Sequence, residues 1–123
     1  MTREQALTIA TRWADAWNER DIERVLGFFG DGITFTSPTA LAVVGSATVQ
    51  GKDALRAYWN LAMSRIESLR FKVERVLWDE ASRELAIVYI AEINGSAKRV
   101  SENLTFGDDG LVVGAEVFHG APE

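Results

Sequence analysis

Cysteine is absent from the sequence, and histidine occurs once, as His119. Without cysteine the chain cannot form disulfides, present a thiolate nucleophile or bind zinc and iron–sulfur clusters through sulfur. A single imidazole excludes sites that need two or three histidines, and the acidic residues lack the spacing of a carboxylate metal site. Nucleophile elbows, phosphate-binding loops and dinucleotide fingerprints are missing as well. We therefore expect no metal site and no cofactor.

Long apolar runs and clustered positive charge are also missing. No run approaches the roughly 20 apolar residues needed to cross a bilayer, and residues 1–5 begin a helical pattern rather than a signal peptide. The net charge is −5, with 13 basic residues scattered among 18 acidic ones, whereas nucleic-acid binding usually shows a basic stripe. We expect a cytoplasmic protein that binds neither nucleic acid nor a membrane.

The composition is typical of one globular domain. The chain has 123 residues, of which 47% are hydrophobic and 25% charged. This is enough for one core, or for one core with a pocket. No internal repeat, linker or low-complexity segment divides the sequence, so we expect a single domain over residues 1–123.

The first half of the chain is predicted to be mainly helical. Leu7, Trp13 and Trp17 fall on one stripe of three- and four-residue steps, which predicts an amphipathic helix. Asp21 is a suitable N-cap for a second, shorter helix. The Gly-Asp-Gly segment at 30–32 is expected to end that helix.

A short strand, a long loop and a third helix are expected next. Residues 33–36 alternate in the manner of a strand. The apolar segment 39–49 is predicted to be a connection of the kind that often forms a lid or a binding loop. A third helix begins at residues 51–53 and buries a stripe that includes Leu55 and Trp59.

The second half of the chain is predicted to be a meander of four strands, over about 69–78, 84–93, 97–106 and 111–119. Asn94-Gly95 and the turn at 108–110 have hairpin chemistry, so consecutive strands should pair antiparallel. Three helices followed by such strands indicate an α+β protein, with the helices packed on one face of a strongly curved antiparallel sheet. A curved sheet covered in this way forms a cone that tends to hold a pocket.

Strand alternation places two candidate catalytic residues on inward faces. Glu102 shares its face with Val100 and Leu104, and His119 shares the face of Ala115 and Val117 in the last strand. Burial would raise the pKa of the Glu102 carboxyl, which suits general acid–base catalysis. The alternative is that Glu102 pairs with an arginine or a backbone amide, or lies at a solvated sheet edge, and that His119 is an ordinary half-buried histidine.

Large side chains on the predicted inner faces are candidates for the pocket lining. The sequence has four tryptophans, and a buried indole N–H needs an acceptor. Trp13 and Trp59 are the better pocket candidates, whereas core packing is the favoured interpretation for Trp17. The full set of candidate lining residues is Trp13, Trp17, Phe29, Phe35, Tyr58, Trp59, Met63 and Tyr89.

Four segments in order resemble the nuclear transport factor 2-like superfamily, and within it the SnoaL-like and ketosteroid isomerase-like proteins. They are residues 13–21 with Phe28-Phe29, residues 33–35, residues 51–59 and residues 102–110. The resemblance covers nearly the whole chain. It implies a cone-shaped α+β fold, a hydrophobic pocket and a homodimer formed through the sheet.

The resemblance also implies roles for individual residues. Trp13 is similar in position to the oxyanion-hole tyrosine of the isomerases, and Glu102 matches their second, protonated acid. Ser37 stands where the isomerases carry the aspartate base, and His119 matches an inward position of the last strand. Since Trp13 and Ser37 depart from the isomerase pattern, steroid isomerisation by that mechanism is not expected.

Three functions remain open. The chain is expected to be a small-molecule pocket protein, acting as an isomerase-, cyclase- or lyase-like enzyme that moves a proton on an apolar carbonyl or polycyclic compound, with Glu102 as acid–base and His119 as its partner. Alternatively, the same pocket binds an apolar ligand without catalysis. In the third hypothesis, aromatic side chains fill the cone and the dimer surface is the functional part.

Overall fold

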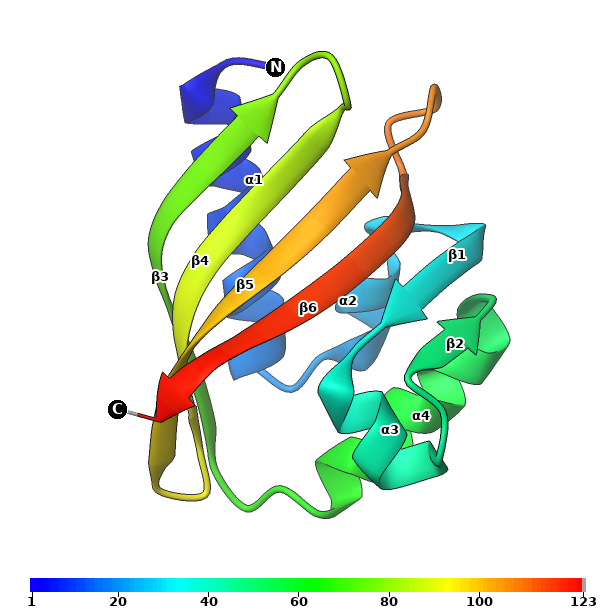
Figure 1. Cartoon of the computed structure of the whole chain (residues 1–123), viewed down its shortest axis with the longest axis vertical. Coiled ribbons are helices and arrows are strands. Elements are labelled where there is room, and N and C mark those ends of the chain that lie inside the picture. Colours follow the sequence, from blue (N-terminus) through cyan, green and yellow to red (C-terminus); the bar gives the residue numbers. More distant parts are fainter. Residues whose placement is uncertain (123) are drawn as a thin grey trace.

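The computed structural model describes residues 1–122. Within them the chain forms four helices and six strands in the order α1 Arg3–Asn18, α2 Ile22–Leu26, β1 Phe29–Thr36, α3 Pro38–Val44, β2 Thr48–Gln50, α4 Lys52–Ser64, β3 Leu69–Asp79, β4 Glu84–Ile93, β5 Ser96–Phe106 and β6 Val112–Pro122 (Figure 1). The α+β prediction is confirmed.

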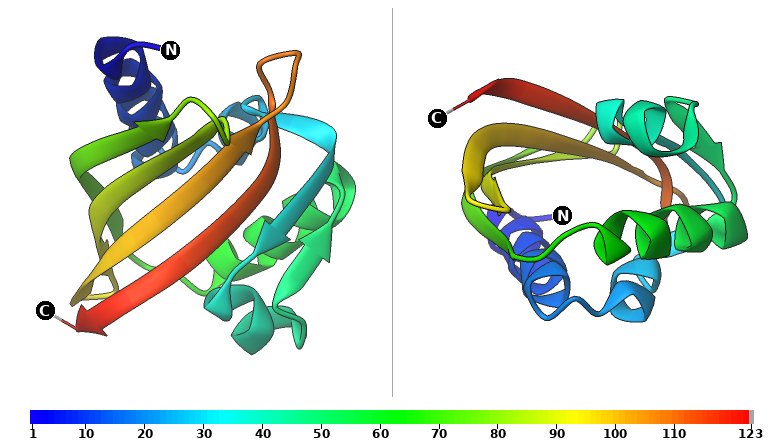
Figure 2. Two further views of the ribbon diagram at one scale, coloured as in Figure 1. Left: turned by 45° about the horizontal axis from the view of Figure 1, so that its top comes forward. Right: turned by 90° about the horizontal axis from the view of Figure 1, so that it is seen from below.

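All six strands belong to one sheet with the order β2-β1-β6-β5-β4-β3. The sheet is strongly curved, and α1, α2 and α4 lie across its concave side (Figure 2). The predicted antiparallel pairing is found for all the strand pairs of the described sheet except one, because β1 and β6 pair in parallel. These strands are far apart in the sequence, so no hairpin turn between them sets their direction.

The first helix begins with a capping box between Thr2 and Gln5. Its buried face contains Trp13 and Trp17, as predicted, but Leu7 is 43% exposed and Ala6 is fully buried instead. The helix packs against β3, and the small side chain of Ala6 belongs to the buried core. The hydrophobic stripe of α1 is therefore displaced by one residue at its N-terminal end.

The segment predicted to be a loop at 39–49 contains a helix and a strand. Ser37 caps α3 by accepting a hydrogen bond from the Thr39 backbone N–H at 3.2 Å, and Pro38 occupies the first turn, where its missing N–H costs nothing. Gly45 ends the helix in the left-handed conformation with φ 79°. The structure thus has four helices among the described residues rather than the predicted three.

The first strand begins at Phe29 rather than at residue 33. The Gly-Asp-Gly segment, predicted to be a helix stop, lies within β1, where the pairing with β6 is irregular between Phe29 and Thr34. The helix before it ends earlier, at Leu26. Glycines at an irregularity in a strand allow the backbone to depart from regular pairing.

A bulge near the start of β6 changes which of its side chains face inward. Thr105 pairs with Gly114, but the next residue, Phe106, pairs with Val112, which leaves Val113 unpaired. Val112 is therefore buried and Val113 is exposed, contrary to the predicted alternation. Beyond the bulge, Ala115 and Val117 are buried as expected.

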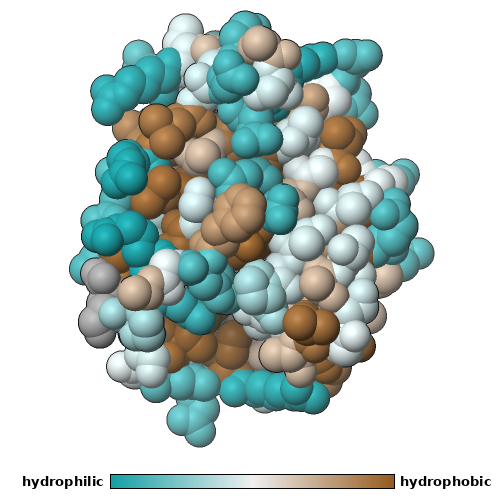
Figure 3. Space-filling model, in the orientation of Figure 1, coloured by the Kyte–Doolittle hydropathy of each residue, from teal (hydrophilic) through white to brown (hydrophobic). Residues whose placement is uncertain are grey.

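The opposite face of the sheet is turned away from the helices and combines polar and apolar side chains (Figure 3). Leu77, Val113 and Phe118 are exposed there, although each belongs to a strand. No helix among residues 1–122 is long and apolar enough to span a membrane.

Candidate functional site

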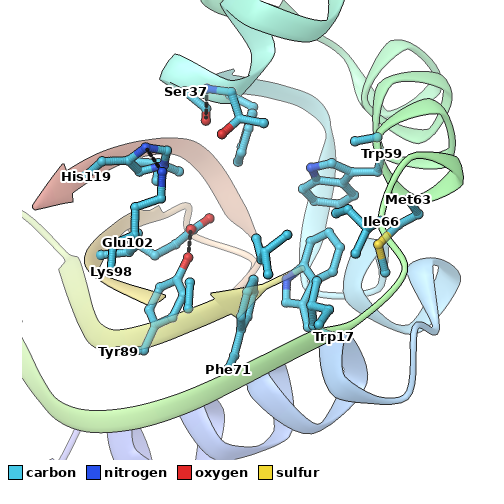
Figure 4. A pocket seen from close by; sticks show the side chains of 18 of the residues that line it. Trp17, Ser37, Trp59, Met63, Ile66, Phe71, Tyr89, Lys98, Glu102 and His119 are labelled. Carbon is cyan, nitrogen blue, oxygen red and sulfur yellow. Dashed lines mark hydrogen bonds between the residues drawn. The ribbon is translucent and has the colours of Figure 1, made fainter. Parts of the chain in front are cut away.

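A cavity of about 130 Å³ lies between the concave face of the sheet and the helices (Figure 4). Most of its wall is aliphatic or aromatic. The lining consists of Trp17, Phe35, Ser37, Thr39, Tyr58, Trp59, Ala62, Met63, Ile66, Leu69, Phe71, Tyr89, Ala91, Ile93, Lys98, Val100, Glu102, Val117 and His119.

Aromatic rings from three elements form the apolar end of this cavity. Trp17 of α1 and Trp59 of α4 meet edge to face with ring centroids 4.9 Å apart, and Phe71 of β3 lies 5.9 Å from Trp17. Such edge and tilted arrangements are favourable for aromatic pairs. Met63 and Ile66 lie beside Trp59 in Figure 4.

Two polar side chains hold the elements of the apolar end together. Asn18 accepts a hydrogen bond from the Phe71 N–H at 2.7 Å and donates one to the Phe71 carbonyl at 3.0 Å, so that α1 is tied to β3. The Arg20 guanidinium donates to the carbonyl of Met63 in the last turn of α4 and to those of Ile66 and Glu67 just after it. The Arg20 bonds thus supply donors to carbonyl groups at the C-terminal end of this helix.

Glu102 is the buried carboxyl group of the cavity, with 5% of its surface exposed. On β5 it lies opposite Ile87 on one side and Val117 on the other, so its neighbours in the sheet are apolar. The Tyr89 hydroxyl donates a hydrogen bond to its Oε1 at 3.2 Å. Burial raises the pKa of Glu102 to about 7, although the Tyr89 hydrogen bond acts in the opposite direction.

Tyr89 is a buried phenol that faces this carboxyl group. Its ring lies 4.7 Å from Phe71 and 5.0 Å from Trp13, measured between centroids. Burial first and the neighbouring Glu102 second raise the pKa of Tyr89 well above that of an ordinary phenol. Tyr89 therefore remains a hydrogen-bond donor at neutral pH.

His119 and Lys98 form a second polar pair on the same wall. The Lys98 Nζ lies 3.2 Å from His119 Nδ1. Burial and the neighbouring Lys98 charge both lower the pKa of His119. Since an ammonium group can only donate, Nδ1 accepts and the neutral imidazole carries its proton on Nε2.

Ser37, which caps α3, and Tyr58 of α4 also contribute hydroxyl groups to the cavity lining. Ser37 is buried, and its Oγ already caps α3. Burial raises the pKa of Tyr58 to about 12, while the nearby Ser37 hydroxyl lowers it. Neither group can act as a base near neutral pH, but each can donate a hydrogen bond.

Eight of the ten predicted site residues line the cavity, and two lie behind its wall. The eight are Trp17, Phe35, Tyr58, Trp59, Met63, Tyr89, Glu102 and His119. The two exceptions are Trp13 and Phe29: the ring of Trp13 packs on Phe71 and Tyr89, and that of Phe29 on Trp59. The preference for Trp13 over Trp17 is therefore reversed in the structure.

The predicted partnership of Glu102 with His119 is not found. Val100 pairs with His119, whereas Glu102 pairs with Val117, so the two side chains are offset by two residues along the strands. Each has a different partner among the described residues, Tyr89 for Glu102 and Lys98 for His119. The predicted oxyanion donor Trp13 is fully buried, and its Nε1 has no hydrogen-bond partner within residues 1–122.

Lys98 and Phe71 also line the cavity, although neither was predicted from the sequence. Both follow a simple signal, because Lys98 alternates with Val100 and Glu102 on β5, and Phe71 alternates with Leu69 on β3. No group of three or more His, Cys, Asp or Glu side chains suited to a metal ion occurs among the described residues.

Residues 10–115 match the sequence model of the SnoaL-like domain. This chain belongs to the SnoaL-like domain family. A SnoaL-like protein of unknown function from Burkholderia thailandensis is 28% identical, with 98% of each chain covered and a TM-score of 0.86. The predicted membership of the nuclear transport factor 2-like superfamily is thus confirmed. A search of curated proteins found no match.

More distant structures share the fold of this SnoaL-like chain. A putative ketosteroid isomerase from Kribbella flavida is 18% identical, with 97% of this chain and 80% of that chain covered and a TM-score of 0.73. TerC, co-crystallised with polyporic acid, is 13% identical, with 94% and 91% covered and a TM-score of 0.77.

Proposed function

We propose that this SnoaL-like protein is an enzyme that transfers a proton on a small, largely apolar carbonyl compound, with Glu102 as the acid–base group. The observation that carries the proposal is a buried carboxyl group, hydrogen-bonded to Tyr89, on the wall of an apolar cavity. Its pKa of about 7 allows the group to take up and release a proton near neutral pH.

The proposed cycle begins with ionised Glu102. The carboxylate removes a proton from the carbon next to a carbonyl group and later returns it to another position of the same substrate, so the enzyme is unchanged after each turnover. Tyr89 stays protonated and holds Oε1, which orients the carboxyl group. The Tyr58 hydroxyl, which also lines the cavity from α4, is the proposed donor to the developing oxyanion.

Exchange of carbon-bound hydrogen tests this function directly. Small cyclic ketones are incubated with the protein in deuterated water, and incorporation of deuterium is followed by NMR. We expect Glu102→Gln to lower the exchange rate at least ~100-fold, because general acid–base catalysis contributes this much. Glu116→Gln, which changes an exposed carboxyl on β6, is the matched control and should leave the rate unchanged.

The same experiment distinguishes the alternative of a ligand-binding module without catalysis. Saturable binding of the ketones with no exchange in the wild-type protein would establish that alternative. The cavity itself favours either pocket hypothesis over a cone filled by its own aromatic side chains.

A homodimer through the outer face of the sheet is part of the proposal. The family resemblance implies it, and the exposed Phe118, Val113 and Leu77 on β6 and β3 provide apolar surface for such a contact.

A further inference from the structure

The polar groups of the cavity are not evenly distributed. In Figure 4, Glu102, Tyr89, Lys98 and His119 gather at one end, while Trp17, Trp59 and their neighbours form the other. A ligand that fills such a cavity should therefore have an apolar body and a polar group at one end only.

Among the residues that the structure describes, the cationic group at the polar end has no acidic partner. The Lys98 ammonium donates to His119 Nδ1 at 3.2 Å, and no carboxylate among residues 1–122 forms an ion pair with Lys98. Burial and the Lys98 charge keep His119 neutral, so the pair carries one positive charge. A half-buried ammonium on an apolar wall gains most from an anion.

The pair also offers the right atoms for binding an oxyanion. Lys98 retains N–H groups besides the one directed to His119. The Nε2–H of the neutral imidazole takes no part in the bond to Lys98. Two neighbouring donors, one of them charged, match two oxygens of a carboxylate.

We propose that Lys98 and His119 form an anion subsite and that the cavity takes a monocyclic acid, with its ring at the apolar end and its carboxylate or similar oxyanion on these two side chains. This inference rests on the proposed function, because it names the substrate class of the same cavity. The volume of about 130 Å³ is close to that of an engineered cavity of about 150 Å³ that binds benzene. The polycyclic compounds considered from the sequence are accordingly replaced by one-ring compounds.

The position of the subsite relates it to the proposed acid–base group. Lys98, Val100 and Glu102 alternate along β5 and all line the cavity. A ligand whose carboxylate is held by Lys98 therefore lies against the same strand that carries Glu102.

Binding of simple probes tests the inference. Benzoate, benzyl alcohol and 2-naphthoate are titrated into the whole protein by calorimetry. We expect wild type to bind benzoate at least ~10-fold more tightly than benzyl alcohol, since a charged hydrogen bond is worth a factor of this size or more. Lys98→Met should abolish the preference, and His119→Phe should reduce it. Lys72→Met, which removes an exposed lysine outside the cavity, should preserve it.

Results that differ from these expectations overturn separate parts of the proposal. Equal affinity for benzoate and benzyl alcohol in wild type overturns the anion subsite, and this measurement does not depend on any variant folding. Equal affinity for 2-naphthoate and benzoate overturns the one-ring limit. Failure of all three probes, with ketone exchange that still depends on Glu102, overturns the inference alone; failure of the probes together with absence of exchange overturns the proposed function as well.

Discussion

The two ends of the cavity are built for different purposes. The apolar end combines aromatic rings from α1, α4 and β3 with close ring contacts and tight links between the elements. At the polar end, by contrast, a carboxyl group has been removed from water with one hydrogen bond at 3.2 Å, and a lysine contacts a neutral histidine. Apolar burial stabilises the fold, whereas a buried carboxyl destabilises it at a pH where it ionises.

The largest stability effect should come from the apolar end. Trp59→Ala removes a ring that is 4% exposed and contacts Trp17, Phe29 and Phe35. We expect a loss of about 3–5 kcal/mol in the free energy of unfolding, because a large buried side chain leaves a cavity behind. Chemical denaturation measures it. Trp78→Ala, at a half-buried ring outside the cavity, is the comparison and should cost less.

At the polar end, stability should depend on pH through Glu102. Its folded pKa of about 7 exceeds the ordinary value of 4.5, so the native state binds the proton more tightly than the unfolded state. The free energy of unfolding should therefore fall as pH rises from about 4.5 to about 7 and then level off, by about 3 kcal/mol in total. In Glu102→Gln this contribution should disappear. Equal pH profiles for the two proteins would contradict the raised pKa.

Removing the Tyr89 hydroxyl should raise the pKa of Glu102 at the polar end without disturbing the ring contacts of Tyr89. Tyr89→Phe keeps the ring contacts with Phe71 and Trp13 but removes the hydrogen bond that lowers the pKa of Glu102. The rate of deuterium exchange should rise with pH as Glu102 ionises. We expect this rise to move to higher pH by about one pH unit or less, because one hydrogen bond is worth about 1 kcal/mol. Tyr58→Phe should leave the pH of this rise unchanged.

The smallest change in folding stability should come from a substitution on the outer face of the sheet. Phe118→Asp places a charge on the proposed dimer surface and should shift the protein towards monomer in light scattering. The fold itself should change in stability by only about 0.5 kcal/mol, since the side chain is exposed. Leu61→Asp, at an exposed position of α4, is the matched control. A monomeric wild-type protein would refute the dimer.

Much of the fold was predictable because its signals are local. The period of two in the second half placed the four long strands within a few residues of their observed bounds, and β4 at its observed bounds. The same alternation placed Glu102 on an inward face. The helix at Pro38–Val44 was missed although its own caps, Ser37 and Gly45, are in the sequence. A short apolar segment without clear helical period does not reveal its structure.

The failures concern relations between distant segments. The parallel pairing of β1 with β6 and the bulge at Val113 arise from contacts that no local pattern encodes. Trp13 and Trp17 are one turn apart on α1, yet only the packing of β3 and β4 against the helix places Trp13 behind the wall and Trp17 on it.

From the sequence alone one can infer the α+β class, the Asp21 cap of the second helix and an acid on the inner face of a strand, since propensity and alternation act over a few residues. The partners of that acid and of His119 depended on the tertiary structure. Strand register set Glu102 opposite Val117 and His119 opposite Val100, and it brought Tyr89 and Lys98 to them instead. Register results from the packing of the whole sheet against its helices, and a shift of one residue would turn both groups out of the cavity.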